Sequence, residues 1–260
     1  MTPSTPPSGD EPAPLCRPAA VSFDVGGTLI VPWPSVGHAY ATVAARFGAG
    51  RIDPDLLNRR FSEAWARRGR EFRYGESDWQ TLVARVFDGV SEVGGDNDFF
   101  KALYEHFATA TPWRVFPDVE PTLTGLRDRG IKLAVVSNWD DRLRPLLTAL
   151  DLDRHFDTIL VSAEEGVQKP DPAIFRETAR RLEVSPAKVV HIGDSTREDV
   201  AGARAAGMQA VRVDRAREQD GEHDLLRQCR LWLFSSSRLN RAAQGSRFSL
   251  QAVAPGNASA

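Results

Sequence analysis

The chain has 260 residues, which is long enough for one large domain or for a core with an inserted module. Its 33 basic and 35 acidic residues give a formal net charge of −2, which excludes a general electrostatic attraction to nucleic acid or to a membrane surface. No segment approaches the roughly 18–20 apolar residues that a membrane-spanning helix needs. The expected partner is a small charged metabolite, and the sequence carries no signal for an oligomeric state.

Both ends of the chain differ in composition from its middle. Residues 1–19 are rich in Pro, Ser and acidic side chains and lack the apolar region of a secretory signal, which predicts a flexible tail and a cytoplasmic protein. Residues 215–260 predict a second, largely irregular tail, in which the apolar patch 225–234 docks on the core or forms an amphipathic helix. The two cysteines, Cys16 and Cys229, lack the spacing of zinc ligands, which is compatible with a reducing compartment.

Short apolar runs between these tails alternate with helical segments. Leucines at helical spacing predict a helix over 140–150, and a second apolar stripe predicts another helix after Pro172. This alternation is typical of an α/β fold with a Rossmann-like, doubly wound parallel sheet. The predicted strands lie near residues 20–25, 132–136, 158–161, 188–192 and 209–213.

The first two predicted strands are separated by about 80 residues with helical patterns and no strand signal. A simple crossover needs far fewer residues, so this segment predicts an inserted, all-helical cap over residues 32–113. The core then consists of residues 20–31 and 114–214. Any single apolar residue of the cap is expected to belong to its helix-bundle interior. The predicted cap helices are 39–47, 55–68, 78–90 and 97–110.

The first strand ends at Asp24, which is followed by Gly26, Gly27 and Thr28. Glycines let the backbone turn tightly and approach a ligand, so this carboxylate is placed as a nucleophile would be. An Asp before two glycines is also a common turn. In a doubly wound sheet, ligands bind beyond the carboxyl ends of the strands, where Asp24 would lie.

Two further polar segments are predicted at this edge of the sheet. Ser137 and Asn138 end the second strand, where the hydroxyl and the next backbone N–H can hold a phosphoryl oxygen, although a strand-terminal serine commonly forms a turn. Lys169 is one of four lysines and precedes a Pro-Asp-Pro segment. Its ammonium would reduce repulsion between an anionic nucleophile and an anionic substrate, unless it is simply a solvated charge.

Asp194 and Asp199 lie five residues apart across a predicted strand-to-helix turn. Oxygen ligands of this kind suit Mg²⁺, with Asp194 binding directly and Asp199 through water or by orienting the site. The alternative is that Asp194 or Ser195 caps the helix. Glu198, beside Asp199, is a further acid without an assigned role.

In order and type, these four segments resemble the motifs of the haloacid dehalogenase superfamily, in its capped form. The resemblance covers residues 21–213 and is strongest to the group of the rhythmically expressed gene 2 family. It implies a core with an inserted cap, a nucleophilic Asp24, a catalytic and phosphate-binding Lys169, and phosphate binding at Ser137 and Asn138. It further implies Mg²⁺ held by Asp24, the carbonyl of Gly26, Asp194 and Asp199.

The chain departs from most phosphatases of this superfamily at Gly26, where they carry a second Asp that protonates the leaving group. Dehalogenases also lack that Asp, but they lack the paired acids that this chain keeps. Phosphonatases have a small residue there and add a cap lysine, whereas the one lysine of this cap, Lys101, lies near its far end. Both activities are therefore ranked below phosphatase.

The sequence thus predicts a Mg²⁺-dependent hydrolase that cleaves a small phosphorylated metabolite through an aspartyl-phosphate on Asp24. The alternative is a weak or inactive protein that binds a phosphometabolite or a protein partner. No motif fixes the cap residues that would contact the leaving group. The candidates, each of which also has a structural or solvated interpretation, are His38, Tyr40, Arg73, Trp79 and Gln80.

Overall fold

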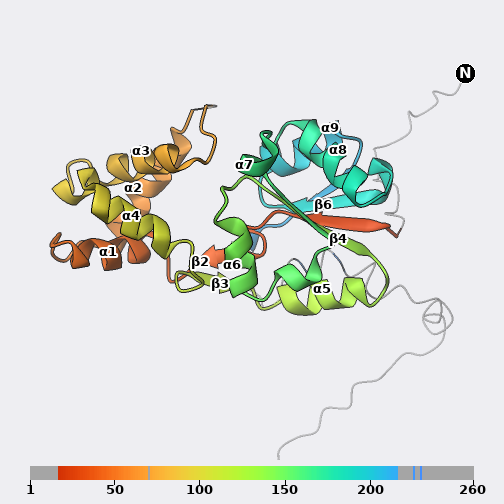
Figure 1. Cartoon of the computed structure of the whole chain (residues 1–260), viewed down its shortest axis with the longest axis horizontal. Coiled ribbons are helices and arrows are strands. Elements are labelled where there is room, and N and C mark those ends of the chain that lie inside the picture. The colour runs from red at the N-terminus through yellow and green to blue at the C-terminus, as the bar shows by residue number, and fades with distance from the viewer. Residues whose placement is uncertain (1–16, 70, 216–224, 226–228, 230–260) are drawn as a thin grey trace, which may run out of the picture.

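The computed structural model describes residues 17–69 and 71–215, together with Leu225 and Cys229. These residues form an α/β core and a helical cap, which lie next to each other along the long axis of the molecule (Figure 1). The predicted N-terminal tail lies outside the described residues up to position 16. Most of the predicted C-terminal tail lies outside them as well.

The core contains a five-stranded sheet in the order β5-β4-β1-β6-β7. Every pair of neighbouring strands is parallel, which confirms the predicted α/β fold. Residues of the central strand pair on both sides, since Ser22 lies opposite Ala134 and also opposite His191. The strands are β1 (Ala20–Phe23), β4 (Lys132–Ser137), β5 (Thr158–Val161), β6 (Val189–Gly193) and β7 (Gln209–Arg212).

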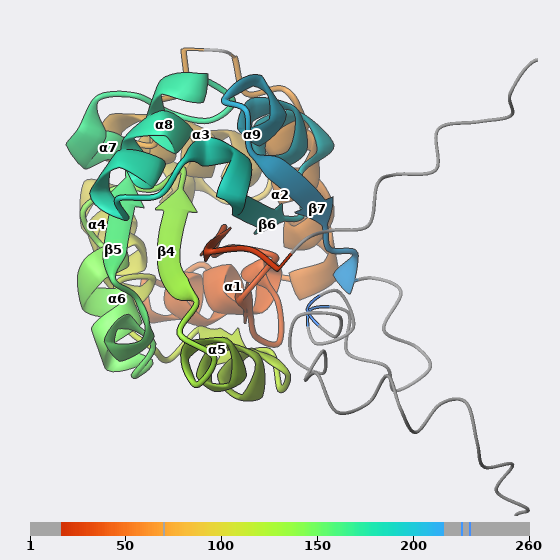
Figure 2. The ribbon, with the colours of Figure 1, turned by 90° about the vertical axis from the view of Figure 1, so that its right-hand side faces the viewer.

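Helices cover both faces of this sheet (Figure 2). On one face, α5 (Val119–Arg127) and α6 (Leu143–Ala149) share an apolar cluster with Phe23. On the other face, α8 (Pro172–Arg181) and α9 (Gly202–Ala205) pack with Ala134 and Val136. All four residues of β1 are buried, because a central parallel strand has helices on both sides. The short α7 (Ser162–Glu165) follows β5.

Two residues of the C-terminal segment belong to the first of these clusters. Leu225 and Cys229 are both fully buried there. The backbone N–H of Leu225 donates to Asp118 Oδ2 at 3.0 Å. At these two positions the predicted apolar patch therefore lies against the core.

The cap helices pack around an apolar cluster of their own, which includes Tyr40, Phe87 and Phe99. Their ends differ from the predicted ones where a polar side chain caps the helix. The first helix begins before position 39 because Ser35 accepts a hydrogen bond from the N–H of His38. The cap helices are α1 (Val36–Arg46), α2 (Pro54–Ala66), α3 (Glu76–Phe87) and α4 (Asn97–His106).

A small antiparallel ribbon joins the cap to the core. It pairs β2 (Ile30–Pro32) with β3 (Trp113–Val115). Its outermost pair, Pro32 and Trp113, face each other at the two ends of the segment 32–113. Strands of three residues are too short to show the alternation by which strands are recognised in a sequence.

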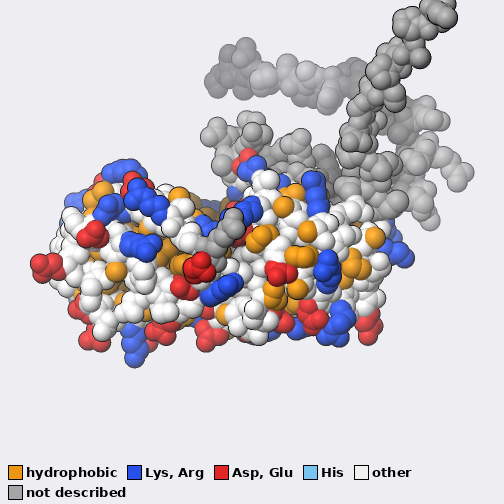
Figure 3. Space-filling view, turned by 90° about the horizontal axis from the view of Figure 1, so that it is seen from above, with side chains coloured by type: hydrophobic (Ala, Val, Ile, Leu, Met, Phe, Trp, Pro, Cys, Tyr) orange, Lys and Arg blue, Asp and Glu red, His pale blue; other side chains and the backbone are white. Residues whose placement is uncertain are grey.

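Among the described residues, no helix combines the length and the apolar character required to cross a bilayer. On the face shown in Figure 3, described acidic and basic side chains are interspersed over both the cap and the core. This distribution agrees with the near-balanced charge of the chain.

Candidate active site

Asp24 follows the central strand and begins a tight turn. Its N–H donates to Ile192 O at 2.9 Å, and the carbonyl of Val25 then accepts from the N–H groups of Thr28, Leu29 and Ile30. The order of strands reverses at β1: the chain adds β4 and β5 on one side of β1, and then β6 and β7 on the other side. Such a point leaves a crevice at the carboxyl end of the strand, and Asp24 lies there.

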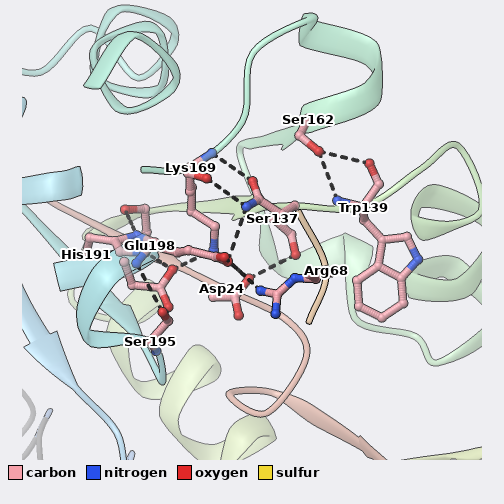
Figure 4. A network of polar contacts seen from close by, with 12 residues as sticks. Asp24, Arg68, Ser137, Trp139, Ser162, Lys169, His191, Ser195 and Glu198 are labelled. Atoms are coloured by element: carbon pink, nitrogen blue, oxygen red, sulfur yellow. Dashed lines mark hydrogen bonds and ion pairs between the residues drawn. The ribbon is translucent and has the colours of Figure 1, made fainter. Parts of the chain in front are cut away.

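The carboxylate of Asp24 contacts two of the residues expected from the sequence (Figure 4). The hydroxyl of Ser137 donates to Asp24 Oδ1 at 2.9 Å, and the ammonium of Lys169 donates to the same oxygen at 2.7 Å. Lys169 also contacts Asp199 Oδ1 at 2.5 Å. Lys169 thus bridges two carboxylates, and all three side chains are buried.

The side-chain amide of Asn138 holds the lysine segment in place. Its Oδ1 accepts from the N–H of Lys169 at 2.8 Å, and its Nδ2 donates to Lys169 O at 3.0 Å. Both ends of this amide are thus engaged with the protein. These contacts involve the side chain alone, whereas the phosphate-binding role expected from the sequence concerns the backbone N–H of Asn138.

Asp24, Asp194 and Asp199 form a cluster in which each offers an oxygen within 4.8 Å of the others. Burial, followed by the charges of Asp24 and Asp199, raises the pKa of Asp194 to about 7. Burial also raises the pKa of Asp24, although Lys169 opposes it. Three crowded carboxylates with a single ammonium repel one another, and a hard divalent cation would relieve that repulsion. The donor set therefore fits Mg²⁺.

Asp199 is the most fully hydrogen-bonded of the three. It accepts from Lys169, from the backbone N–H of Ser195 at 2.9 Å, and it contacts His191 Nε2 at 3.1 Å. Burial alone would raise the pKa of Asp199, but Lys169 and His191 outweigh it and hold that pKa below its usual range. A Cβ on Gly193 would lie 2.2 Å from Asp199 Cγ, so glycine is required for this approach.

A family model described as haloacid dehalogenase-like hydrolase matches residues 18–207. The chain belongs to this family. It is 37% identical to haloacid dehalogenase-like hydrolase domain-containing protein 3 of Bos taurus, over 74% of this chain and 80% of the relative. It is 28% identical to the Rhythmically expressed gene 2 protein of Drosophila melanogaster, over 76% of this chain and 84% of that protein.

Two further comparisons involve proteins named as phosphatases. A phosphoserine phosphatase of Thermus thermophilus is 37% identical over 58% of this chain and 65% of its own length. The crystal structure of a HAD phosphatase from Thermococcus onnurineus superposes with a TM-score of 0.55 at 30% identity, covering 78% of this chain and 88% of that one. The resemblance inferred from the four motifs is confirmed at the level of the family.

In this haloacid dehalogenase-like chain, the turn after β6 is a π-helix over Thr196–Ala201. Ser195 caps it, since its hydroxyl accepts from the N–H of Glu198 at 3.0 Å. The capping alternative therefore holds for Ser195, while Asp194 remains beside the other carboxylates. π-Helical turns are rare and concentrate at functional sites.

Glu198 and Arg68 also line the cavity, although no role was assigned to them from the sequence. Glu198 Oε1 accepts from Arg68 Nη2 at 3.0 Å, and Oε2 accepts from Asn138 Nδ2 at 3.3 Å. Arg68 comes from the cap, two residues after the end of α2, so this ion pair joins the cap to the core (Figure 4). The position of Glu198 beside Asp199 was the one available signal, and nothing marked Arg68.

His191 is a second residue that the motifs did not identify. It is fully buried within β6, where Nδ1 contacts Ser22 Oγ at 2.9 Å while Nε2 contacts Asp199. Burial lowers its pKa, so the neutral ring is favoured despite the nearby carboxylate. His191 thereby fixes the orientation of Asp199.

A cavity of about 540 Å³ extends from Asp24 into the cap. Of the five cap candidates, Tyr40 and Trp79 line it, and the other three do not. His38 instead contacts Ser35 at 2.8 Å, Gln80 donates to Asn97 at 2.8 Å, and Arg73 is exposed.

Proposed function

We propose that this chain is a Mg²⁺-dependent phosphatase that acts on a small phosphorylated metabolite through an aspartyl-phosphate on Asp24. One observation carries the proposal: the buried Lys169 ammonium and the Ser137 hydroxyl converge on Asp24 at the floor of the cavity. A cation and a hydroxyl beside a carboxylate form a cradle for an anionic phosphoryl group. The phosphatase names of two similar proteins support the same reaction class.

In the first step, Asp24 attacks the phosphorus of the bound monoester, and the bond from phosphorus to the leaving oxygen breaks. The electron pair of that bond stays on the leaving oxygen. Lys169 neutralises part of the charge on the transferred group, while Ser137 and the backbone N–H of Asn138 bind its oxygens. Water then attacks the phosphorus, the bond to Asp24 breaks, and inorganic phosphate leaves. The proton released by the water passes to phosphate or to solvent.

The residues that would hold Mg²⁺ are Asp24, Asp194 and Asp199, together with the backbone carbonyl of Gly26. When bound, the cation neutralises charge on the phosphoryl oxygens and on the crowded carboxylates. The remaining chemistry belongs to the chain. Asp199, fixed by His191 and by the backbone N–H of Ser195, orients Lys169 toward the nucleophile.

Gly26 supports the second candidate, a weak or inactive phosphometabolite-binding protein. A glycine has no carboxyl group to protonate the leaving oxygen, and general acid catalysis typically contributes about 10²–10⁴-fold. The paired acids Asp194 and Asp199 argue against dehalogenation. The cap lysine, Lys101, is exposed on α4 and does not line the cavity, which argues against a phosphonatase.

Acetyl phosphate separates the two candidates, because it transfers a phosphoryl group without needing a proton donor. We expect the wild-type chain to hydrolyse it with Mg²⁺ and far less after chelation. Asp24→Asn is expected to lose activity by at least about 10³-fold, as removal of a nucleophile does. Asp141→Asn is a suitable control, because Asp141 is exposed and does not line the cavity.

The outcome for each candidate is distinct. Near-normal turnover by a folded Asp24→Asn chain means that Asp24 is not the nucleophile. A folded wild-type chain that binds phosphate with Mg²⁺ but releases no acetate is the binding protein instead. Cooperative unfolding of each variant, followed by circular dichroism, establishes that it is folded.

A further inference from the structure

Aromatic side chains form a large part of the wall of the cavity above Asp24. Ten of its 26 lining residues are Phe, Tyr or Trp, contributed by the cap, by β3 and by the loop after β4. Three cap rings stand nearly parallel: Phe61 and Trp65 at an interplanar angle of 13°, and Trp65 and Trp79 at 14°. Trp113 and Trp139 continue the lining toward the core, with their ring centroids 5.3 Å apart.

The cationic side chains of this lining already have carboxylate partners. Arg68 pairs with Glu198 and lies 3.7 Å above the ring of Trp65. Arg142 contacts Asp140 at 2.6 Å and lies 3.4 Å above Tyr104. The third cation, Lys169, bridges Asp24 and Asp199. A charged substituent on the leaving group would therefore have to break an existing pair or be buried without a partner, and burying an unpaired charge is strongly unfavourable.

An aromatic ring also lies against the position of the missing acid. A Cβ on Gly26 would lie 3.3 Å from Cζ3 of Trp139, so the indole covers this glycine. The backbone of Trp139 is fixed, because its N–H donates to Ser162 Oγ at 3.1 Å and its carbonyl accepts from the same hydroxyl at 3.1 Å. At Gly26, the site thus presents an apolar ring rather than a proton donor.

We propose that the substrate is a phosphate monoester of a neutral, planar aromatic alcohol, whose ring occupies the aromatic cavity. This inference rests on the proposed phosphatase function. The bond from phosphorus to the aryl oxygen breaks as Asp24 bonds to phosphorus, and the aryloxide leaves with the electron pair. Its charge is delocalised into the ring, so it departs without a proton donor and takes a proton from solvent after release. The ring packs against the aromatic walls and leaves the three ion pairs intact.

The test compares an aryl ester with an alkyl ester of the same leaving ability and with an ester whose leaving group is charged. Phenyl phosphate is compared with a fluoroalkyl phosphate whose alcohol is as acidic as phenol, and with phosphoserine, whose leaving group is charged. Acetyl phosphate reports on the phosphatase function itself. We expect kcat/KM for phenyl phosphate to exceed that of the fluoroalkyl ester by at least about 10-fold, within the range that an apolar pocket discriminates. Equal kcat/KM values for these two esters would overturn the inference, even if acetyl phosphate is hydrolysed well.

A binding measurement keeps the inference testable if no ester is hydrolysed. Phenylphosphonate and butylphosphonate are inert, and tryptophans in the cavity lining provide a fluorescence signal. With Mg²⁺ present, we expect phenylphosphonate to bind about 10-fold more tightly than butylphosphonate. Binding of the two phosphonates with the same Kd would contradict an aromatic leaving-group site, independently of catalysis.

Variants then assign the preference to the cavity wall. Trp65→Leu should lower the ratio of kcat/KM for phenyl phosphate to that for acetyl phosphate by about 10-fold, and Trp65→Phe should restore most of it. Phe99→Leu is the matched control, because Phe99 is buried in the cap interior and does not line the cavity. This control lowers the stability of the cap but should leave the ratio unchanged. The same ratio in all four proteins would show that the wall does not select the ring.

Discussion

Two adjacent glycines in the turn after β1 differ in whether the position can accept a side chain. Gly27 has a φ of +75°, and a Cβ there would lie 2.8 Å from Asp194 Oδ2, so both the backbone and the neighbouring carboxylate require glycine. Gly26 has no such backbone requirement. Its constraint is the indole of Trp139, which is a side chain that can shift. Only Gly26 can therefore accept a carboxylate without backbone strain.

Replacing Gly26 by Asp tests whether the site lacks an acid. We expect Gly26→Asp to raise kcat/KM for an alkyl phosphate by up to about 10²-fold, the lower end of the general-acid range, with little change for phenyl phosphate. Combining it with Trp139→Leu should enlarge the gain, because the new side chain no longer meets the ring. If wild-type protein already hydrolyses alkyl and aryl esters equally well, another residue supplies the proton.

Asp194 and Glu198 are neighbouring acids for which we predict different responses to Mg²⁺. Mg²⁺ at a concentration about 100-fold above its Kd should raise the wild-type Tm by about 5 °C, because it binds the folded chain and not the unfolded one. Asp194→Asn should abolish this rise and should increase Tm without Mg²⁺, since it removes repulsion within the carboxylate cluster. Glu198→Gln should retain the rise, because Glu198 pairs with Arg68.

An equal loss of the Mg²⁺ response in both variants would mean that the metal site is misplaced. Differential scanning calorimetry measures each Tm, and Ca²⁺ provides a second divalent cation for comparison. Activity is not needed for this measurement, so it remains informative for the inactive alternative.

At the scale of elements, the closest helix packing in the cap is between α1 and α2. A Cβ on Gly37 would lie 2.0 Å from Pro54 O and 2.8 Å from Asn58 Oδ1. The N–H of Gly37 donates to Asn58 Oδ1 at 2.7 Å, and Asn58 Nδ2 donates to Ser35 Oγ at 2.9 Å. The glycine thus lets the start of α1 rest directly on the first turn of α2.

Gly37→Ala should separate these two helices. We expect the free energy of unfolding to fall by about 1–3 kcal/mol, as it does on overpacking, despite the better helix propensity of alanine. Gly95→Ala is the control, since a Cβ there meets nothing within 4 Å. Urea unfolding of both variants measures the difference. Equal stability of the two would show that the cap helices adjust without cost.

At the scale of the whole molecule, polar contacts hold the cap against the core in addition to the β2–β3 ribbon. Arg68 pairs with Glu198, Gln168 Nε2 donates to Phe72 O at 3.2 Å, and Arg142 Nη1 donates to Tyr104 O at 3.0 Å. Each contact joins a core residue to a cap residue, and the residues of the first and third contacts also line the cavity. Opening of the cap must therefore break these contacts together.

A double-mutant cycle measures how strongly one of these contacts couples the two parts. Arg68→Gln, Glu198→Gln and the double variant should give a coupling energy of about 0.5–1.5 kcal/mol in unfolding, because both side chains are about three-quarters buried, at 23% and 24% exposure. The cycle for Arg154 and Glu120, which are 52% and 49% exposed, should give at most about 0.5 kcal/mol. Similar values in the two cycles would contradict a specific cap contact.

Much of the core could be predicted because its signals are local. Each strand of the sheet is a short apolar run, and parallel strands place their carboxyl ends at one edge. Asp24, Ser137 and Asp194 could therefore be assigned to one site from their positions at predicted strand ends. The strand limits were accurate to one or two residues, whereas β2 and β3 were missed because three residues show no period.

The sequence by itself determined the parallel sheet, the presence of an inserted helical cap and the polar residues at the strand ends, because each follows from residues a few positions apart. Only the tertiary structure decided what surrounds them. Arg68 and Glu198 are 130 positions apart, and Trp139 covers Gly26 from a different loop. An apolar stripe on a helix indicates that one face is buried, but it does not indicate whether that face lies against a packed interior or against a cavity. Tyr40 and Phe99 have the same sequence signature, and the folded chain places only Tyr40 at the cavity wall.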